Sequence, residues 1–342
     1  MSTLYQLTSI KIGAPFATDI IQASTRVNYG QNLNVIHGLE TMVCMAIDGA
    51  MQIEGGNWQI FDRMVAASDA SAILNTTVYE ISRSKGRYNV KYLTQHSDGN
   101  ASSTEPFDTI VLAAPWQFAK INIEKDILKR VPDEIPYVTL HVTLFASNRT
   151  INPLFFNITT GAEVPTTVLT TLPPDAKMPA NQPEGVGPAG FFSISTLRQV
   201  INPETLEIEH LYKIFSPKAI DSEFLSKLLG ADVPTDLDSI SAKDSPVSWY
   251  YPHVWQSYPV ELPRITFEDS ELARGFYYTS GMESFISTME TMALMGKNVA
   301  QLVIDDFQQL KQDHATGDEL VLEQMPLVEE VQTGEQIIKE EI

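Results

Sequence analysis

Apolar residues in the C-terminal third of the chain follow first a strand period and then a helix period. Residues 276–278 (Phe-Tyr-Tyr) are typical of a buried strand, and Gly281 permits a sharp turn behind them. Ser287 and Glu290 form a capping box, which predicts a helix that starts at about Thr288. Small or apolar side chains then recur at spacings of three and four, which predicts one apolar helix face: Met289, Met292, Ala293, Gly296, Ala300, Val303 and Phe307.

The start of this predicted helix could receive a negatively charged group or a hydrogen-bond acceptor. The capping box would occupy the third helical N–H and leave the N–H groups of Thr288 and Met289 free. A helix N-terminus carries partial positive charge and favours negative charge in front of it. From periodicity alone, the plainer interpretation is a well-capped core helix that binds nothing.

The first third of the chain passes from helices into a small predicted sheet. We expect helices within residues 1–50 and an amphipathic helix over 59–68. Alternating apolar residues predict a strand over 72–82, followed by a hairpin-like pair from residue 87 to residue 94. Residues 107–115 are a near-continuous apolar run that ends at a proline, as expected for a strand covered on both faces.

The middle of the chain predicts a mostly β region. Strand patterns are present in residues 138–145, 166–172 and 191–196. Residues 206–214 and 221–229 are expected to be helical or mixed. Residues 249–259 (Trp-Tyr-Tyr-Pro-His-Val-Trp-Gln-Ser-Tyr-Pro) form an aromatic cluster, for which a ligand-binding wall and a place in the core are equally good interpretations.

Composition favours a large globular protein and excludes some partners. The chain has 342 residues, 43% of them hydrophobic, which is enough for two intertwined domains. Its formal net charge of −20 makes nucleic acid and anionic membranes poor partners. Much of the acid excess lies near the C-terminus, so we expect residues 313–342 to be a disordered acidic tail. No run of eighteen apolar residues exists, so no transmembrane helix is predicted.

Several further signals bear on location and chemistry. The single cysteine, Cys44, sits among apolar residues, which favours a buried inert thiol over a nucleophile. The N-terminal residues do not resemble a signal peptide. Four N-glycosylation sequons, a mild excess over chance, give a weak indication of a secretory origin; they begin at Asn75, Asn100, Asn148 and Asn157. The first of them lies inside a strand pattern and is the least suitable acceptor.

Motifs for other chemistries are missing or misleading. Residues 185–190 fit G-x-G-x-x-G, but no strand precedes them, Pro188 removes an N–H, and a strand pattern follows instead of a helix. We therefore reject this segment as a dinucleotide-binding loop. The six histidines are scattered and none is spaced as a metal pair, so no metal site is predicted. No G-x-S-x-G motif supports a hydrolase triad.

The strand-turn-helix segment resembles the C-terminal FAD segment of the amine-oxidase-like flavoproteins. The sequence of residues 277–283 (Tyr-Tyr-Thr-Ser-Gly-Met-Glu), followed by Thr-Met-Glu and Lys-Asn-Val-Ala, is most similar to the prenylcysteine oxidase (prenylcysteine lyase) family. Residues 25–32 (Thr-Arg-Val-Asn-Tyr-Gly-Gln-Asn) and 249–259 resemble the same family. The resemblance covers about residues 10–310 and lacks the family's N-terminal β-α-β unit, whose glycine-rich turn holds the FAD pyrophosphate.

The resemblance implies an α+β or α/β fold with two intertwined parts. Residues 51–115 and 266–312 would be the remaining part of an FAD-binding domain. Residues 1–50 and 116–265 would form a substrate domain of mixed β-sheet and helices. The cofactor is then FAD, with these residues as its implied contacts: Gly281, Glu283, Thr288 and Met289, supported by Gly55, Gly56, Val78 and Pro115.

The activity implied is that of an FAD-dependent thioether oxidase in the catabolism of prenylated proteins. Such an enzyme cleaves farnesyl- or geranylgeranyl-cysteine to cysteine, a prenyl aldehyde and hydrogen peroxide, with oxygen as the electron acceptor. The family's location implies the lysosome, the vacuole or the secretory pathway. No catalytic acid or base can be assigned, although His253 and Tyr251 are candidates. Arg26 could form a structural ion pair or line the site, and Glu283 could serve only to stabilise the helix dipole.

Two alternatives remain open. Without the nucleotide-binding unit, the chain could be a truncated, non-catalytic remnant or a protein that binds a prenyl ligand. It could also be another amine-oxidase-like flavoenzyme, such as a polyamine oxidase, which would want an aromatic cage for a cation. Because the pyrophosphate-binding turn is missing, we expect that this chain alone does not hold FAD stably.

Overall fold

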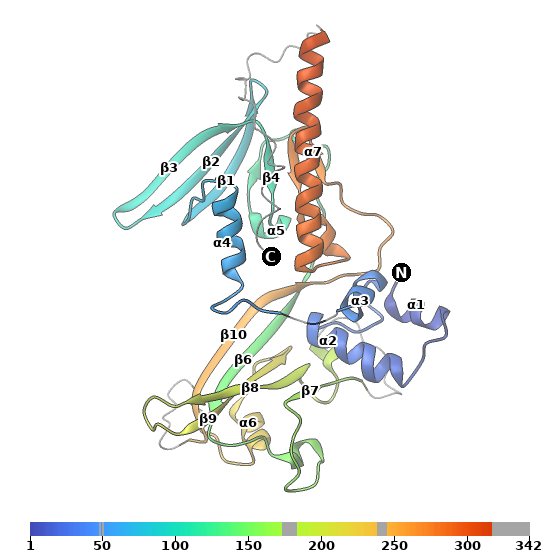
Figure 1. Cartoon of the computed structure of the whole chain (residues 1–342), viewed down its shortest axis with the longest axis vertical. Coiled ribbons are helices and arrows are strands. Elements are labelled where there is room, and N and C mark those ends of the chain that lie inside the picture. Colours follow the sequence, from blue (N-terminus) through green and yellow to red (C-terminus); the bar gives the residue numbers. More distant parts are fainter. Residues whose placement is uncertain (48, 50, 173–182, 238–244, 317–342) are drawn as a thin grey trace, which may run out of the picture.

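The fold is mixed α+β, as expected, and is described by a computed structural model (Figure 1). The structural statements below concern the residues that it describes, which are 1–47, 49, 51–172, 183–237 and 245–316. Within these residues the strands form three separate sheets. Short 3₁₀ segments connect the larger elements: η2 (Pro153–Phe156), η3 (Pro183–Val186) and η4 (Ser280–Ser284).

The N-terminal segment is helical, which confirms the expectation for residues 1–50. Its elements are α1 (Thr3–Ser9), the π-helix η1 (Phe16–Gln22), α2 (Ala23–Tyr29) and α3 (Gly38–Met45). Their apolar sides meet around Leu33 and Ile36, which are fully buried. Cys44 lies in the same cluster, which confirms its predicted burial, and burial raises the pKa of its thiol, as expected for an unreactive cysteine.

The first sheet has the strand order β3-β2-β1-β5. Its strands are β1 (Thr76–Ser84), β2 (Arg87–His96), β3 (Gly99–Phe107) and β5 (Asn122–Ile123). The strand expected over 72–82 therefore begins only at Thr76. The sequence did not predict β3, because its residues Gly-Asn-Ala-Ser-Ser-Thr-Glu-Pro-Phe carry no apolar alternation and are mostly exposed.

The second sheet has the strand order β11-β12-β4. Its strands are β4 (Ile110–Leu112), β11 (Glu271–Ala273) and β12 (Phe276–Tyr278). All three residues of β12 are buried, which confirms the strand expected over 276–278. The strand expected over 107–115 is shorter than predicted and is not covered on both faces, since Val111 is 47% exposed. The reason is that β4 is an outer strand of this sheet, and a proline-ended apolar run does not reveal whether the second face is covered.

Helix α7 (Met289–Thr316) lies alongside the second sheet (Figure 1). Tyr277 of β12 anchors it by donating a hydrogen bond to Asp306. The helix was predicted correctly but its buried face was not: Val299 is buried, whereas Ala293, Gly296 and Ala300 are exposed. Both sides of this helix carry small or apolar residues, so periodicity cannot choose between them. Because α7 continues to Thr316, it overlaps the start of the acidic tail expected over 313–342, and the rest of that tail lies outside the described residues.

The third sheet is antiparallel with the strand order β10-β6-β9-β8-β7. Its strands are β6 (Tyr137–Ser147), β7 (Thr167–Leu169), β8 (Ser193–Ile201), β9 (Ile208–Ser216) and β10 (Val247–Pro259). Helix α6 (Ser222–Leu229) covers one face, where its leucines pack against Phe145, Tyr212 and Ile214. The helical or mixed interpretation of residues 206–214 is wrong, because from Ile208 onward they form β9, whose alternate side chains are buried. Segment 221–229 is the helix α6.

The remaining helices are α4 (Trp58–Ala67) and α5 (Trp116–Ala119). Helix α4 confirms the one expected over 59–68, but none of its residues is buried. Gly187 and Gly190 form a turn that leads into β8, so the rejected G-x-G-x-x-G segment does not open a helix. No helix among the described residues is long and apolar enough to cross a membrane. The division of the chain into a cofactor part and a substrate part stays a prediction.

Candidate functional site

The candidate site lies where the two parallel strands β4 and β12 end. Their register pairs Tyr278 with Leu112, so both strands end at the same edge of the sheet. The N–H of Thr279 donates to the Leu112 carbonyl at 3.1 Å, and the N–H of Trp116 donates to the Tyr278 hydroxyl at 3.2 Å. Ligands of sheets with parallel strands bind outside the carboxyl ends of those strands. The loops that contain Pro115 and Gly281 therefore meet at such an edge.

Gly281 is required at this edge by close packing. It is buried in η4, and a Cβ added to it would lie 2.7 Å from the Cβ of Glu268. No real Cβ approaches another atom so closely, and the obstacle is not the mobile end of a side chain. The Gly281 carbonyl in turn accepts a hydrogen bond from the Ser284 hydroxyl at 2.8 Å. These contacts fix the turn between β12 and α7.

The N-terminus of α7 is capped differently from the prediction. Thr288 is the cap, because its Oγ1 accepts from the N–H of Thr291 at 3.1 Å, while its own N–H donates to Thr291 Oγ1 at 3.0 Å. The N–H of Ser287 donates to a carboxylate oxygen of Glu40 at 2.8 Å, so the Ser287–Glu290 capping box is wrong. Of the two N–H groups expected to be free, that of Met289 has no partner among the described residues, whereas that of Thr288 is satisfied.

Three glutamates approach the start of α7 from separate parts of the chain. They are Glu40 from α3, Glu261 after β10 and Glu283 from η4. Glu261 has no exposed surface, and neither of its carboxylate oxygens has a partner among the described residues. Burial, and secondarily the negative charges of Glu40 and Glu283, raise the pKa of Glu261 to about 10. This carboxyl is therefore neutral at neutral pH, which avoids a buried unpaired charge.

Tyrosines accompany two of these glutamates. The Tyr137 hydroxyl donates a hydrogen bond to Glu283, one of the expected cofactor contacts, and burial is the main cause that raises the pKa of Tyr137. Burial also raises the pKa of Glu40, whose carboxyl lies near the Tyr29 side chain. Sequence reasoning missed Glu40 and Glu261. The i,i+4 spacing that puts Glu40 on the same helix face as Cys44 is the signal that could have found the first.

The supporting residues expected from the sequence are only partly brought together. Val78 packs in the same core cluster as Leu112 and Tyr278, next to the site edge. Gly55 and Gly56 instead form a turn in front of α4, where the Gly55 carbonyl accepts a hydrogen bond from the Trp58 indole at 3.0 Å. The hydrogen bonds that hold this turn run within residues 53–59. The role of Gly55 and Gly56 as cofactor contacts stays a prediction.

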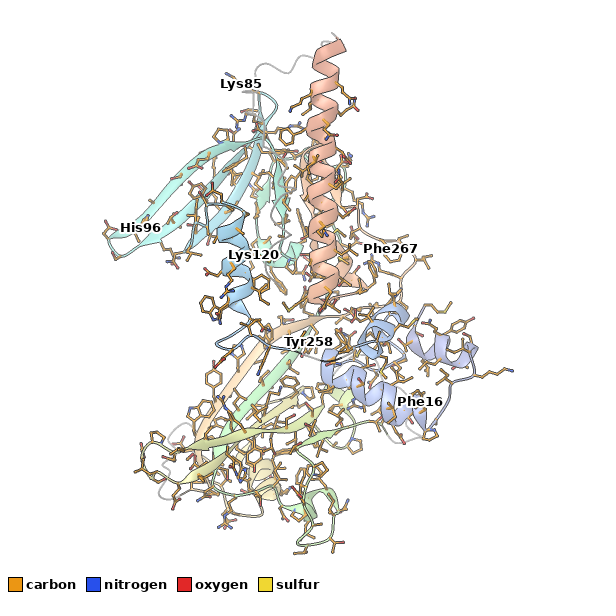
Figure 2. The ribbon with its side chains drawn as sticks, viewed as in Figure 1. Phe16, Lys85, His96, Lys120, Tyr258 and Phe267 are labelled. Atoms are coloured by element: carbon orange, nitrogen blue, oxygen red, sulfur yellow. The ribbon has the colours of Figure 1, made fainter. Side chains whose placement is uncertain are left out.

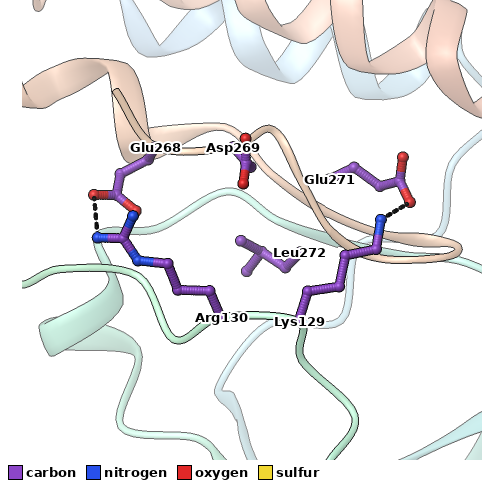
Figure 3. Close-up of a pocket in the computed structure, with 6 residues that line it drawn as sticks. All are labelled: Lys129, Arg130, Glu268, Asp269, Glu271 and Leu272. Carbon is purple, nitrogen blue, oxygen red and sulfur yellow. Dashed lines mark hydrogen bonds and ion pairs between the residues drawn. The ribbon is translucent and has the colours of Figure 1, made fainter. Parts of the chain in front are cut away.

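Two hollows lie near the second sheet. One of about 200 Å³ adjoins the Pro115 loop, and its lining residues are Leu112, Trp116, Gln117, Ala119, Lys120, Ile121 and Glu134. This volume is below the ~300–1,000 Å³ usual for small-molecule sites. The other, of about 10 Å³, lies between ion pairs, Lys129 with Glu271 at 2.8 Å and Arg130 with Glu268 at 3.8 Å (Figure 3). It has room for no more than a water molecule.

The aromatic residues of 249–259 lie on the outer strand β10, where Tyr250 and Tyr258 pack against core clusters and the other four are exposed. Trp249, Tyr251, His253 and Trp255 project from the same side of the strand, with successive ring centroids 6.0 to 6.2 Å apart. We call these four residues the aromatic row. Its tyrosine and two tryptophans are 46 to 49% exposed, which removes the core interpretation for the residues of the row. Tyr258, labelled in Figure 2, lies at the end of the strand, where its ring packs against Tyr29 of α2.

Arg26 is a buried cation without an ion pair among the described residues. It is 1% exposed and donates hydrogen bonds to the Val186 carbonyl at 2.6 Å and to Thr170 Oγ1 at 3.2 Å. Its guanidinium also lies 5.6 Å from the centre of the Phe192 ring. Burial lowers the pKa of Arg26 to about 10. The residue thus holds the connection between β7 and β8 against α2, but not through the ion pair that was considered.

Comparison with known proteins identifies the class to which this chain belongs. The family described as prenylcysteine lyase matches residues 2–317, so the chain belongs to that family. Similar relatives include the farnesylcysteine lyase of Arabidopsis thaliana, which is 27% identical over 88% of this chain and 52% of its own length. Prenylcysteine oxidase 1 of Bos taurus is 28% identical over 88% of this chain and 56% of its own length. The chain therefore spans little more than half the length of these relatives.

Among solved structures, variants of putrescine oxidase are similar in part. One double mutant matches with a TM-score of 0.47 and 13% sequence identity, over 89% of this chain and 68% of the other. A triple mutant gives a TM-score of 0.44 and 12% identity over the same shares.

No group of three or more histidine, cysteine or acidic side chains among the described residues could hold a metal ion.

Proposed function

We propose that this chain carries the substrate-binding part and one end of the cofactor site of an FAD-dependent thioether oxidase. The substrate would be a prenylcysteine, cleaved to cysteine, a prenyl aldehyde and hydrogen peroxide with oxygen as acceptor. Membership of the prenylcysteine lyase family supports this proposal, as do relatives named farnesylcysteine lyase and prenylcysteine oxidase 1. The observation that carries it is the Met289 N–H at the start of α7, which has no partner among the described residues and lies next to the edge where β4 and β12 end.

The residues at this edge fit one end of FAD. The Met289 N–H lacks a partner among the described residues and could donate to a carbonyl oxygen of the flavin pyrimidine ring. Gly281, packed against Glu268, fixes the turn before α7, and Pro115 lies on the neighbouring loop. When bound, FAD supplies the oxidation of the carbon attached to sulfur. The chain's contribution is to orient the cofactor and to favour negative charge on it through the α7 dipole, by about 0.3–2 kcal/mol.

The aromatic row supplies an apolar surface suited to a prenyl chain. The register places the half-buried Leu144 of β6 beside Tyr251, so this aliphatic side chain continues the surface of the row, whereas Leu140 beside Trp255 is buried. Burying a CH₂ group of an isoprenoid on such a surface contributes about 0.8 kcal/mol. His253 and Tyr251 are within this row, and a role for either as acid or base stays a proposal.

The site is expected to be incomplete in residues 1–342. The glycine-rich turn and helix that hold a pyrophosphate in dinucleotide-binding folds are not among the motifs of this sequence. Charge-assisted hydrogen bonds of the kind made there contribute roughly 1.5–3 kcal/mol each, and about 1.4 kcal/mol is tenfold in affinity. Purified residues 1–342 should therefore lose added FAD on gel filtration, as measured by flavin absorbance. A stoichiometric yellow monomer would contradict this expectation.

The activity can be tested in a chimera. The matched 305-residue region of the Arabidopsis relative would be replaced by this chain, and peroxide formation would be measured with S-farnesylcysteine. We expect a yellow protein that forms peroxide with farnesylcysteine. A yellow chimera that forms peroxide with putrescine but not with farnesylcysteine would contradict the proposed substrate and favour an amine oxidase.

A second candidate function is binding of a prenyl ligand without catalysis. The exposed aromatic row favours it, because this surface is complete without any cofactor. In that case farnesylcysteine would bind to the chain and to the chimera, but neither would form peroxide.

We also propose a lysosomal, vacuolar or secretory location. All four sequon asparagines are exposed, including Asn75, which immediately precedes β1 and does not lie inside a strand. Treatment of the native protein with an endoglycosidase should lower its apparent mass. An unchanged mass would remove this support.

A further inference from the structure

A lysine lies on the same sheet face as the aromatic row. The register pairs Tyr251 of β10 with Leu144 of β6, and Leu144 with Lys213 of β9. Directly paired residues of neighbouring antiparallel strands project from the same side of a sheet. With strands about 4.8 Å apart, the Cα of Lys213 lies roughly 10 Å across the sheet from that of Tyr251. Lys213 and the aromatic row thus belong to one continuous surface.

This surface is covered near Leu140 but is partly accessible from Val142 to Lys213. Helix α6 packs on the opposite face of the sheet. On the face with the aromatic row, Val186 and Phe192 cover Leu140, while Val142 and Phe215 are only partly buried. Leu144 and Lys213 are half-buried as well. A ligand lying across β10, β6 and β9 would therefore touch aromatic rings, then aliphatic side chains and finally the lysine.

Lys213 has no counter-charge in the part of the chain that the structure describes. Its ammonium lies 4.5 Å from the centre of the Phe215 ring, and no ion pair or hydrogen bond engages it among the described residues. Burial is the cause that lowers its pKa, and no neighbouring carboxylate opposes the shift. This is unusual in a chain with 43 acidic and 23 basic residues. A half-buried cation on an apolar face gains most from an anion that arrives with an apolar body.

We infer that Lys213 binds the carboxylate of an amphiphilic ligand whose apolar chain lies along the aromatic row. This inference rests on the proposed function, under which the ligand is a prenylcysteine. The cysteine carboxylate would pair with the Lys213 ammonium, and the isoprenoid would extend over Leu144 towards Tyr251 and its neighbours. The carboxylate would then decide which end of the substrate faces β9, a preference that an apolar surface alone cannot supply.

The test is equilibrium binding to purified residues 1–342, followed by quenching of tryptophan fluorescence, since Trp249 and Trp255 are part of the row. S-farnesylcysteine would be compared with its carboxamide, which lacks only the negative charge. We expect the acid to bind about tenfold or more tightly than the carboxamide. Lys213→Met should reduce acid binding to the affinity of the carboxamide and leave the carboxamide unaffected. Lys213→Arg, which keeps the charge, should retain the preference.

The matched control is Lys227→Met. Lys227 lies on α6, on the opposite side of the sheet, where it pairs with Glu223 at 2.6 Å, so its loss should leave both affinities unchanged. Equal binding of acid and carboxamide to the unaltered chain, or an undiminished preference in Lys213→Met, would overturn the role of Lys213 but not the proposed function. If neither compound quenches fluorescence, the substrate surface itself is refuted, and the role of Lys213 with it.

Discussion

Glu40 accepts a hydrogen bond from the N–H of Ser287 at 2.8 Å, across 247 positions of sequence. This bond joins the N-terminal helices to the start of α7. Glu40→Ala would leave a partly buried N–H unsatisfied, which costs about 1–3 kcal/mol, whereas Glu40→Gln keeps an acceptor oxygen and should cost less than about 1 kcal/mol. Urea unfolding measures both. Glu290→Ala is the control, because Glu290 is exposed and is not the cap partner. A larger loss of stability for Glu290→Ala than for Glu40→Ala would contradict this assignment and support the Ser287–Glu290 capping box.

The pH dependence of stability tests the buried state of Glu261. Its pKa is raised from 4.5 to about 10, so between these pH values the folded state holds a proton that the unfolded chain has released. Stability is therefore greatest below about pH 4.5 with respect to this group, and it falls as pH rises, by up to about 1.4 kcal/mol per pH unit. The raised pKa values of Glu40 and Glu283 act in the same direction.

Glu261→Gln removes this titration and should flatten the fall. Urea unfolding of both proteins between pH 5 and pH 9 measures the difference, and the variant should be the more stable protein at the alkaline end. A wild-type stability that rises over this range, or parallel curves for the two proteins, would show that Glu261 is ionised in the folded state.

Replacing two glycines of the same region by alanine should change the stability of the fold in opposite directions. Gly281→Ala places a Cβ 2.7 Å from Glu268 Cβ and should destabilise the fold by about 1–3 kcal/mol. Gly296 lies inside α7 with nothing within 4 Å of an added Cβ, so Gly296→Ala should stabilise by up to about 1 kcal/mol. Thermal unfolding of the two variants checks both signs. A neutral Gly281→Ala would mean that the turn before α7 is not packed as described.

Removal of the Met289 N–H tests the cofactor end of α7. Proline is well tolerated at the first position of a helix, so Met289→Pro should leave folding intact. In a form of the protein that binds FAD, it should weaken FAD binding or lower the flavin reduction potential, as measured by dye-coupled titration. Ser222→Pro is the matched control, since Ser222 is the first residue of α6, far in sequence from α7. Identical flavin spectra and potentials for both variants would refute this role of the α7 N-terminus.

The sequence was informative where one pattern decided one element. The apolar alternation of β6 and the three aromatic residues of β12 predicted these strands, whereas residues 221–229, expected to be helical or mixed, form α6. The polar β3 could not be predicted, because its pairing with β2 alone makes it a strand. The buried side of α7 was missed because both of its sides carry small or apolar residues.

The candidate site followed the same division. The segment from Gly281 to Met289 could be proposed from local pattern and resemblance, and Pro115, also implied by the resemblance, lies on the loop at the same edge. The contact between Glu40 and Ser287 could not, because no local rule relates residues so distant in sequence.

The most direct test of the central claim is the choice of ligand by residues 1–342. Tryptophan fluorescence would be titrated with S-farnesylcysteine, S-geranylgeranylcysteine and putrescine under identical conditions. The account predicts saturable quenching by the two prenylcysteines and none by putrescine, because the exposed aromatic row and the neighbouring Leu144 offer an apolar surface. Saturable binding of putrescine, or the absence of binding by both prenylcysteines, would contradict it.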